Sequence, residues 1–529
     1  MPPGMASPGF AFPASRVTPN TLDWPVTGTD PSDDWWREGS AIVNRSWHLW
    51  RNNPYALAMV RTMVEGAVGQ CGLTPRSLFN RDVGLTAATD PTQVAALVAA
   101  NGMRSQVEKS LRSAYQGKRF DAVGQYTKRD MTEIMLVSCV VAGDAWSVRQ
   151  WKPNRPGRQY QSTCWRIVDS ARVSNPNFGN NTATRFEGIE LDDDGCPIGI
   201  WIQKRNPYAV QVVDWTWDYT PWYAPDGSLN VTHMMAPGRP DQLRGVGWFS
   251  SIMGLVNQLG SVTDAFVVAK RVQACIGIIR SSMDQGAAAT AGKNGSTNTG
   301  AQKLYPGMIM DVPSGTTVTP LQWNFQGNDH SQFQDSMLQA ITAAWGLPME
   351  YVQHRLTKSN LASARVALMQ AYRTFATAQE MLISHVEQPW AESVIREEMA
   401  RGRLPSASDD QLDDMFSFKW NRPARPYPDP LKEWVAAKNA TDMGVSPSTA
   451  HAQQGLDFAS EILQSQQDAT LMAAHGVQLN TGGNSPTSAP GSAIGNIQID
   501  DGSADTPDNS APPDGTTFQP QTTGQGPQP

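Results

Sequence analysis

The sequence predicts an α+β protein of several domains, in which helical segments surround a region of mostly antiparallel strands. The chain has 529 residues, enough for about three domains of ordinary size. Hydrophobic residues make up 40% of the chain and charged residues 17%, so a sizeable core can form. The hydrophobic pattern changes from helical spacing to alternation near residue 140 and returns to helical spacing near residue 248.

The N-terminal part predicts a flexible arm followed by two helices. Residues 1–31 are rich in Pro, Thr, Ser and Gly, a composition typical of an unstructured segment. Apolar residues then recur at helical spacing from Asp33 to Trp50. Asn53 can cap the next helix, and Pro54 fits its first position, where no N–H is needed.

The middle of the chain predicts strands. After a polar stretch at 76–105 and a helical pattern at 106–140, apolar and polar residues alternate as far as Val231. Two alternating runs flank Asp192–Gly195, which indicates a hairpin closed by an Asp-Gly turn.

The second half of the chain is mainly helical by its periodicity. Two long apolar runs lie at 248–273 and 360–401, and Pro389 should kink the second because it lacks an N–H and clashes with the preceding turn. Residues 476–529 contain no Lys or Arg and are rich in Gly, Pro, Ser and Thr, which predicts disorder. The other expected elements are a loop at 284–300, short strands at 304–312 and 316–321, and helices at 331–346, 430–442, 447–454 and 457–475.

The overall charge and the cysteines exclude some classes of protein. A net charge of −7 disfavours tight non-specific binding of nucleic acid over the whole surface. The five cysteines lie far apart without CxxC spacing, which indicates reduced core residues folded in a cytosolic environment. The N-terminus lacks a basic start and no stretch approaches 18 apolar residues, so we expect neither a targeting segment nor membrane insertion.

No motif supports an enzyme, a metal site or a cofactor site. The segment from Gly286 to Lys293 differs from a phosphate-binding loop in its spacing, and Asn294 replaces the hydroxyl residue that would bind Mg²⁺. The seven histidines are isolated, and neither HExxH nor GxSxG occurs. One alternative stays open: a metal-dependent nuclease or hydrolase using Asp192–Asp194 and His233, although a solvated turn is the simpler interpretation of the aspartates.

Two further segments have a functional and an ordinary interpretation. The Trp and Tyr residues at 201–223 could stack on single-stranded nucleic acid, but packing within a β region is the better interpretation because few cations lie among them. Residues 355–360 join two helices and carry two cations with small polar groups, as an ordinary surface turn does.

Seven blocks of sequence occur in a fixed order over about residues 35–475. They are RSWHLWRNNPYA at 45–56, VEGAVGQCGL at 64–73, GDAW at 143–146, His233 with RPDQLRGV at 239–246, AWGLP at 344–348 with Tyr351, SNLASAR at 359–365, and Trp420 with PDPLKE at 428–433. This series resembles the lambda-type family of tailed-phage portal proteins. Asp241 replaces a Gly that is common in that family, and Leu361 and Ala362 also depart from it. The residues that match the family motifs are Arg45, Arg51, Asn52, Asn53, Pro54, Arg239, Gln242, Arg244, Gly245, Gly346, Pro348 and Arg365.

The resemblance implies a non-enzymatic protein of the virion, assembled in the host cytoplasm. Portal proteins form a ring, usually of twelve subunits, at one capsid vertex, and double-stranded DNA enters and leaves through the ring. The implied partners are further copies of this chain, the major capsid protein, the terminase motor and the head–tail connector proteins. A head–tail adaptor or minor capsid protein without a DNA channel is the alternative of the same general kind.

The resemblance also implies a portal-like division of the chain. It maps a β-containing wing, a helical stem, a small clip, a tunnel loop, a long kinked helix and a helical crown onto the segments between the two arms. These are the wing at 32–240, stem helix at 245–275, clip at 276–322, second stem helix at 330–347, tunnel loop at 349–361, kinked helix with a return to the wing at 362–429, and crown at 430–475.

Two sets of site residues follow from this division. The tunnel loop would contact DNA weakly and without regard to sequence, because every phosphate–cation contact deepens binding and a channel must let the duplex pass. Its candidate residues are Arg355, Lys358, Ser359 and Asn360. Apolar helix faces would form the contacts between subunits, with Ile252, Leu255, Leu259, Val262, Phe266, Leu368 and Phe375 as candidates.

Overall fold

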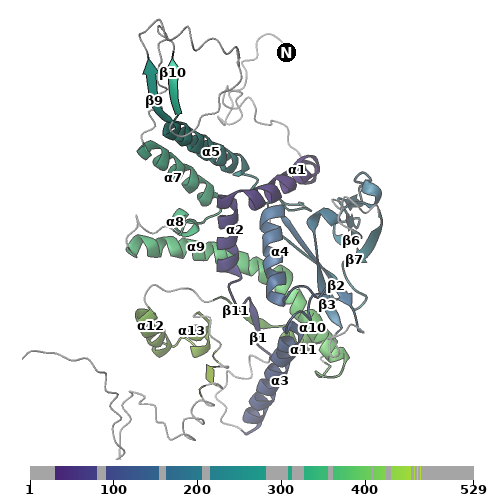
Figure 1. The fold of residues 1–529 in the computed structure, drawn as a ribbon. Coiled ribbons are helices and arrows are strands. Elements are labelled where there is room, and N and C mark those ends of the chain that lie inside the picture. Colours follow the sequence, from purple (N-terminus) through teal and green to yellow (C-terminus); the bar gives the residue numbers. More distant parts are fainter. Residues whose placement is uncertain are drawn as a thin grey trace, which may run out of the picture. The chain divides into compact units, whose positions relative to one another are not determined.

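The computed structural model shows a mixed helix and sheet protein with mainly antiparallel sheets (Figure 1). The chain separates into a compact unit, Met1–Gln464, and a second unit, Ser465–Pro529. All the elements below belong to the first unit. The structure describes residues 30–79, 91–153, 162–204, 215–236, 238–281, 308–312, 327–354, 361–406, 409–423 and 430–453, with single positions up to Ser465. The arm before Asp30, the loop at 284–300 and the tail at 476–529 lie outside the described residues.

Four helices make up most of the N-terminal part: α1 (Pro31–Asn52), α2 (Pro54–Ala67), α3 (Pro91–Tyr115) and α4 (Lys128–Ala142). The expected cap is confirmed: Asn53 Oδ1 accepts from the backbone N–H groups of Tyr55 at 2.9 Å and Ala56 at 3.2 Å. The helical pattern at 106–140 is interrupted, because both carboxylate oxygens of Asp121 accept backbone N–H bonds and organise a turn between α3 and α4.

Part of the polar stretch at 76–105 is regular structure, contrary to expectation. Strand β1 (Thr74–Ser77) pairs antiparallel with β11 (Phe418–Asn421), and α3 begins at Pro91. The composition of this stretch hid both elements, because β1 takes its partner from the far end of the chain and α3 contains many polar residues.

The strand region forms two antiparallel sheets that share a small core. One has the order β3-β2-β8, from β3 (Thr163–Val168), β2 (Asp144–Trp151) and β8 (Val231–Met235); the other has the order β4-β5-β6-β7, from β4 (Arg185–Phe186), β5 (Ile189–Leu191), β6 (Pro197–Gln203) and β7 (Trp217–Pro221). The hairpin at Asp192–Gly195 is confirmed as the β5–β6 turn. Short turns η3 (Ser170–Arg172) and η4 (Pro176–Phe178) lie between the sheets in sequence. The shared core is Trp146, Val148, Val168, Val173, Ile189, Ile200, Ile202 and Val231.

The helical second half begins with α5 (Met253–Cys275), which lies beside α7 (Gly327–Ala344). Gln334 of α7 donates to Thr263 of α5 at 3.1 Å. Strands β9 (Ile276–Ser281) and β10 (Met308–Val312) pair in parallel. The remaining elements are α8 (Met349–Val352), α9 (Leu361–Leu382), η5 (Ile383–Glu387), α10 (Gln388–Ala400), α11 (Asp409–Met415), α12 (Pro430–Asp442) and α13 (Pro447–Gln453).

The irregularity expected at Pro389 is a π-helical turn, η5, immediately before α10. Proline has no N–H to give to the carbonyl four residues earlier, so the helix changes its hydrogen-bonding pattern there. The helix axis changes direction between α9 and α10 (Figure 1).

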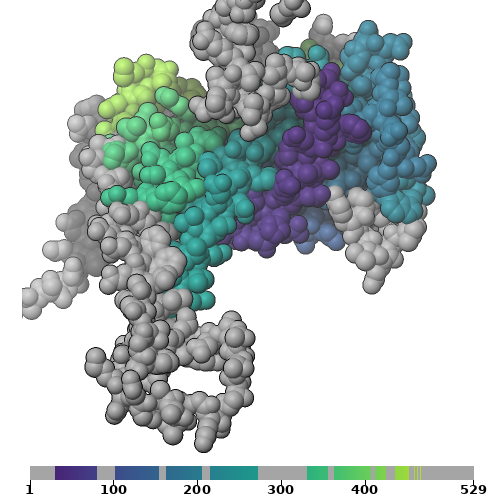
Figure 2. Space-filling view, turned by 90° about the horizontal axis from the view of Figure 1, so that it is seen from above, coloured from purple at the N-terminus to yellow at the C-terminus, as the bar shows by residue number. Residues whose placement is uncertain are grey.

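Helix α10 is bonded to the β3-β2-β8 sheet. Glu397 accepts from the N–H groups of Ser162 and Thr163, both at 2.7 Å, and Trp390 Nε1 donates to Ser147 Oγ at 3.0 Å. The N-terminal helices lie between the strand region and the helices of the second half in Figure 2, where α1 and α2 are purple. One large core joins residues of α2, α4, α5, α9 and α10. Among the described residues, no helix has the length and apolar character to cross a membrane.

Candidate functional site

A buried ion pair joins two of the sequence blocks. Asp144 is fully buried at the start of β2 and pairs with Arg244, which is 100 residues away in the chain. Asp144 Oδ1 also accepts from the Gly245 N–H at 2.5 Å and lies 3.1 Å from His233 Nε2. Burial alone would raise the pKa of Asp144, but Arg244 and His233 outweigh burial and hold the pKa below its ordinary value. Asp144 is therefore a buried anion with matched partners.

Arg244 also connects α1 to the strand region. Its guanidinium donates to the carbonyl of Val173 at 3.1 Å, the carbonyl of Glu187 at 3.0 Å, and the carbonyl and hydroxyl of Ser170 at 3.2 and 2.9 Å. Its charge lies 4.5 Å from the ring centre of Trp35 in α1. The guanidinium N–H groups of Arg244 are thus bonded to other groups of the chain. Arg244 therefore stabilises the fold rather than presenting a cation to a ligand.

Gly143 of the GDAW block and Gly245 of the RPDQLRGV block are in direct contact. Gly143 has a φ of 94°, and a Cβ at Gly245 would overlap the Gly143 carbonyl. Between the block residues Arg239 and Gly245, Gln242 Nε2 donates to the Arg244 carbonyl at 2.7 Å and closes the turn. Asp241 in this turn has a φ of 61°, a left-handed conformation that explains why glycine suits this position in the resembled family.

The GLP block builds the connection from α7 to α9. Gly346, with a φ of 67°, follows α7, and its carbonyl accepts from Thr374 Oγ1 of α9 at 2.9 Å. Pro348 directly precedes α8, and Trp345 Nε1 donates to the Trp248 carbonyl at 3.2 Å. The motif residues Arg45, Arg51, Asn52, Pro54, Arg239 and Arg365 are exposed.

The four residues predicted to contact DNA, Arg355, Lys358, Ser359 and Asn360, lie outside the described residues. The positions on both sides are described. Residues 349–352 form the short helix α8, and α9 begins at Leu361.

The residues predicted to join subunits divide into three groups by their exposure. Ile252, Leu259 and Phe375 are at most 3% exposed because they lie in the chain's own large core, so a contact with another copy cannot rest on them. Leu255 is 38% exposed. The other three are half-buried: Val262, Phe266 and Leu368.

A second buried ion pair, not anticipated from the sequence, holds the π-turn. Glu387, the last residue of η5, is completely buried and lies 2.5 Å from Lys128 Nζ of α4. Its other oxygen accepts from Thr132 at 2.6 Å, and Lys128 also donates to the Leu73 carbonyl at 2.9 Å. Tyr115 lies against this pair, and burial, with the Glu387 charge, raises its pKa well above the ordinary value. The only hint in the sequence is a carboxylate at a helical core position.

The residues of the nuclease alternative have structural partners. Asp192 Oδ1 accepts from the backbone N–H groups of Asp194 at 3.0 Å and Cys196 at 2.7 Å in an exposed turn. His233 is stacked on Trp146, with ring centres 3.7 Å apart. Within the part of the chain that the structure describes, no group of three or more His, Cys, Asp or Glu side chains could hold a metal ion.

The cysteine and aromatic expectations are partly wrong. Cys139 and Cys164 are buried as expected, and burial raises the pKa of the Cys139 thiol to about 12, whereas Cys71 and Cys196 are exposed. Of the aromatic residues at 201–223, Trp222 packs against the shared core of the sheets. Three others do not follow the packing interpretation because they are largely exposed: Trp215, Tyr219 and Tyr223.

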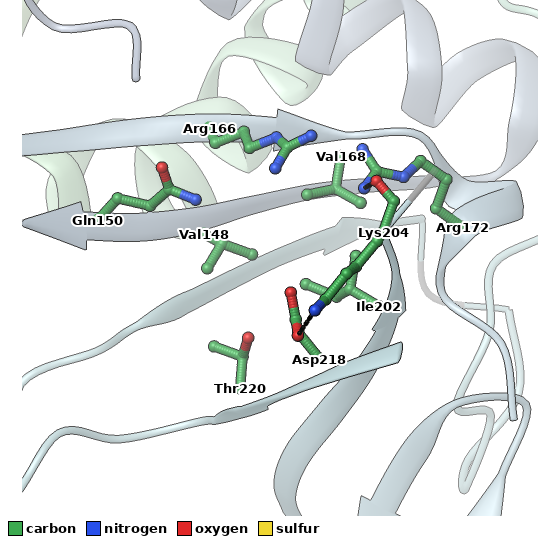
Figure 3. A pocket seen from close by; sticks show the side chains of 9 residues that line it. All are labelled: Val148, Gln150, Arg166, Val168, Arg172, Ile202, Lys204, Asp218 and Thr220. Atoms are coloured by element: carbon green, nitrogen blue, oxygen red, sulfur yellow. Dashed lines mark hydrogen bonds and ion pairs between the residues drawn. The ribbon is translucent and has the colours of Figure 1, made fainter. Parts of the chain in front are cut away.

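A cavity of about 320 Å³ lies between the two sheets (Figure 3). Three of its charged groups have partners: Arg172 donates to the carbonyls of Gln203 and Lys204, and Lys204 pairs with Asp218 at 3.2 Å. Burial, with the nearby Arg166 charge, lowers the pKa of Arg172. The lining residues of the cavity are Val148, Gln150, Arg166, Val168, Arg172, Ile202, Lys204, Asp218 and Thr220.

Comparisons with known proteins agree with the order of the blocks. The chain is 22% identical over 242 residues to the portal protein of Escherichia phage N15, covering 42% of this chain and 45% of the relative. It is 22% identical over 343 residues to portal protein B of Escherichia phage lambda, covering 58% of this chain and 62% of the relative. The matched segments thus span less than two thirds of either relative.

Among solved structures, the neck of a native gene transfer agent particle, computed with C12 symmetry, matches with a TM-score of 0.41 at 14% identity, covering 82% of this chain and 95% of that chain. Phage portal proteins are the class to which both curated relatives belong. The family model for phage portal proteins of the lambda family matches residues 18–379, more than half of the chain. The chain belongs to the lambda family of phage portal proteins.

Proposed function

We propose that copies of this chain form the portal ring at one capsid vertex and that double-stranded DNA passes through the ring during packaging and ejection. The observation that carries this proposal is the family match over residues 18–379. The buried charge clusters support a structural role, because their donors and acceptors are bonded within the chain rather than presented to a substrate.

The division into portal parts is proposed on the positions of the elements. The two sheets with α1 to α4 would form the wing, α5 and α7 the stem, and β9 with β10 part of the clip. Helices α9 and α10, joined at the π-turn, would be the long kinked helix, and α12 and α13 would begin the crown. The clip would dock the terminase motor and later the head–tail connector proteins, and the major capsid protein would surround the wing in the virion.

Contacts between subunits are proposed for exposed apolar residues of the helices rather than for the buried ones. A ring needs two different surfaces on each subunit, one contacting the neighbour on either side. On α5, Val267 and Val268 are 40% and 56% exposed, and on α9, Val366 and Met369 are 59% and 60% exposed. Covering such side chains with a neighbouring copy would stabilise a ring through apolar burial.

DNA contact in the channel is proposed to be weak and independent of sequence. The chain carries a net charge of −7, and many copies of such a chain repel a duplex overall. Arg355 and Lys358 would steady the DNA backbone at a few points around the ring, and the absence of base contacts would let every sequence pass.

Native mass spectrometry and electron micrographs of the purified chain test the ring. A closed ring with an open central hole supports the portal, a ring without a hole supports an adaptor, and a lasting monomer, even with capsid subunits present, contradicts both. Val268→Asp and Val366→Asp should leave mostly monomer, while Val123→Asp, at a site 43% exposed outside the helices concerned, should leave the ring intact. Tight duplex binding by rings at physiological salt would contradict the weak-contact channel.

A further inference from the structure

The outer side of the β4-β5-β6-β7 sheet carries aromatic rings that are open to solvent. Trp201 pairs across the strands with Tyr219, and Gln203 pairs with Trp217, so these side chains point away from the shared core. Phe178 and Trp215 extend the group, with ring centres 5.2 Å apart. The group, which we call the aromatic face, consists of Phe178, Trp201, Trp215, Trp217 and Tyr219.

The rings of the aromatic face are held in place by contacts with one another. Trp201 and Tyr219 lie 5.1 Å apart, and Phe178 and Trp217 lie 5.2 Å apart. Gly199 leaves room for Tyr219, because a Cβ there would overlap the tyrosine ring. Even so, Phe178, Trp215 and Tyr219 remain 50%, 52% and 41% exposed. Fixed and exposed aromatic rings are typical of surfaces that bind a partner.

Backbone strain at Phe178 is a second indication that this surface binds a partner. Asn177 and Phe178 have φ values of 55° and 51°, a left-handed conformation that is unusual for a residue as bulky as phenylalanine. The buried Asn175 holds this segment: its side chain donates to the Gly179 carbonyl at 2.9 Å and accepts from the Gly188 N–H at 2.7 Å. The strain places a half-exposed ring rather than a core residue, and such strain is concentrated at binding sites.

The chemistry of the face favours an apolar, extended peptide over a nucleic acid strand. Two of the three indole N–H groups are already used, since Trp217 donates to Ser174 at 3.0 Å and Trp201 to Glu190 at 3.2 Å. Arg185, which lies over Trp201, is paired with Glu190 at 3.3 Å, so it is not available to a phosphate. Aromatic surfaces with this character bind proline-rich segments, which enter already extended.

The chain itself supplies such a segment. Residues 1–29 contain six prolines and three aromatic residues but only two charged residues, Arg16 and Asp23. They join α1 at Asp30, close to Trp35, whose ring contacts Phe186 of β4 with centres 6.5 Å apart. Figure 2 shows the purple N-terminal helices next to the blue strand region. An extended chain of this length reaches roughly 100 Å, several times the width of a four-stranded sheet.

We propose that residues 1–29 bind the aromatic face, with their prolines packed against Phe178, Trp215 and Tyr219. Tethering raises the effective concentration of the segment to about the millimolar range, so individually weak contacts suffice. The proposal does not depend on ring formation or on passage of DNA.

The test measures binding of a fluorescent peptide of residues 1–29 to the chain lacking those residues, by anisotropy. We expect saturable binding that weakens about tenfold in Trp215→Ser and in Tyr219→Ser. Trp151→Ser, at a tryptophan of β2 that is 61% exposed, should bind as the parent does. The full chain, with its own segment in place, should bind the peptide at least tenfold more weakly than the truncated chain.

Phe178→Asn separates binding from folding. Asparagine tolerates the left-handed conformation, so this variant should melt no lower than the parent and yet bind the peptide about tenfold more weakly. Unsaturable binding, equal binding by the full chain, or equal losses in Trp151→Ser and Trp215→Ser would overturn the proposal. So would equal binding of a peptide of residues 505–529, which is also proline-rich, or tighter binding of single-stranded DNA.

Discussion

Arg244→Met should show how much the buried ion pair contributes to the strand region. The substitution keeps an apolar stem of similar length but leaves Asp144, which is 0% exposed, as a buried anion without its cation. Breaking a buried pair by removing one partner costs about 3–5 kcal/mol. The variant also loses the guanidinium hydrogen bonds to Val173, Glu187 and Ser170, which lie in the same part of the strand region. We therefore expect a loss of about 4 kcal/mol in local stability.

Hydrogen exchange of the β2 and β8 amides is the suitable assay, because a chain with several cores need not unfold in one step. The pH dependence has a defined sign. In the parent, the lowered pKa of Asp144 gives stability above its ordinary pKa that is lost as the pH falls through the folded value. In Arg244→Met, burial without the guanidinium raises the folded pKa, so the native state takes up a proton more readily and the loss of stability relative to the parent becomes smaller as the pH falls.

Arg239→Met is the matched control for this experiment. Arg239 belongs to the same sequence block, but its ion pair with Asp34 is exposed, at 53% and 50% for the two side chains. Such a pair contributes about 0–1 kcal/mol. If Arg244→Met destabilised β2 by less than about 1 kcal/mol, or no more than Arg239→Met does, the buried pair would not be what holds the block to the sheet.

Three other substitutions test the caps and turns that position the helices. Asn53→Ala removes the acceptor for two N–H groups of α2 and should lower stability by about 1 kcal/mol, seen as faster exchange in the first turn of α2. Asp241→Val should cost about 1–2 kcal/mol in melting experiments because of its left-handed backbone, whereas Asp241→Gly should cost nothing; equal effects of the two would contradict the conformational explanation. Lys128→Met should destabilise α10 by about 3–5 kcal/mol, and the double variant Lys128→Met with Glu387→Met should recover most of that loss in the same exchange assay.

Local features of the fold could be predicted from the sequence because their causes are local. The cap at Asn53 with Pro54, the Asp-Gly hairpin and the irregularity at Pro389 each depend on a few neighbouring residues. The shared order of the blocks gave the family, although no block by itself shows that Asp144 meets Arg244.

Features that depend on distant partners could not be predicted in this way. Glu387 meets Lys128 and Thr132 across about half of the chain, and a helical pattern gives no sign of which core position holds a charge. Periodicity also does not tell whether an apolar face meets its own chain or another copy. For this reason Ile252 and Phe375 looked like subunit contacts and are core residues instead. Alternation likewise predicted a two-faced sheet without showing that one face stays uncovered.

The pairing of β1 with β11 has a consequence for synthesis on the ribosome. Ser77 aligns with Phe418, so the first of these strands leaves the ribosome long before its partner exists. At about 5–20 residues per second, the wait is roughly 20–70 s. Throughout that interval the nascent chain exposes an unpaired strand edge, the kind of edge that joins with other chains and aggregates. Translation therefore completes this sheet only after about four fifths of the chain has been made, although its first strand is among the earliest parts of the protein.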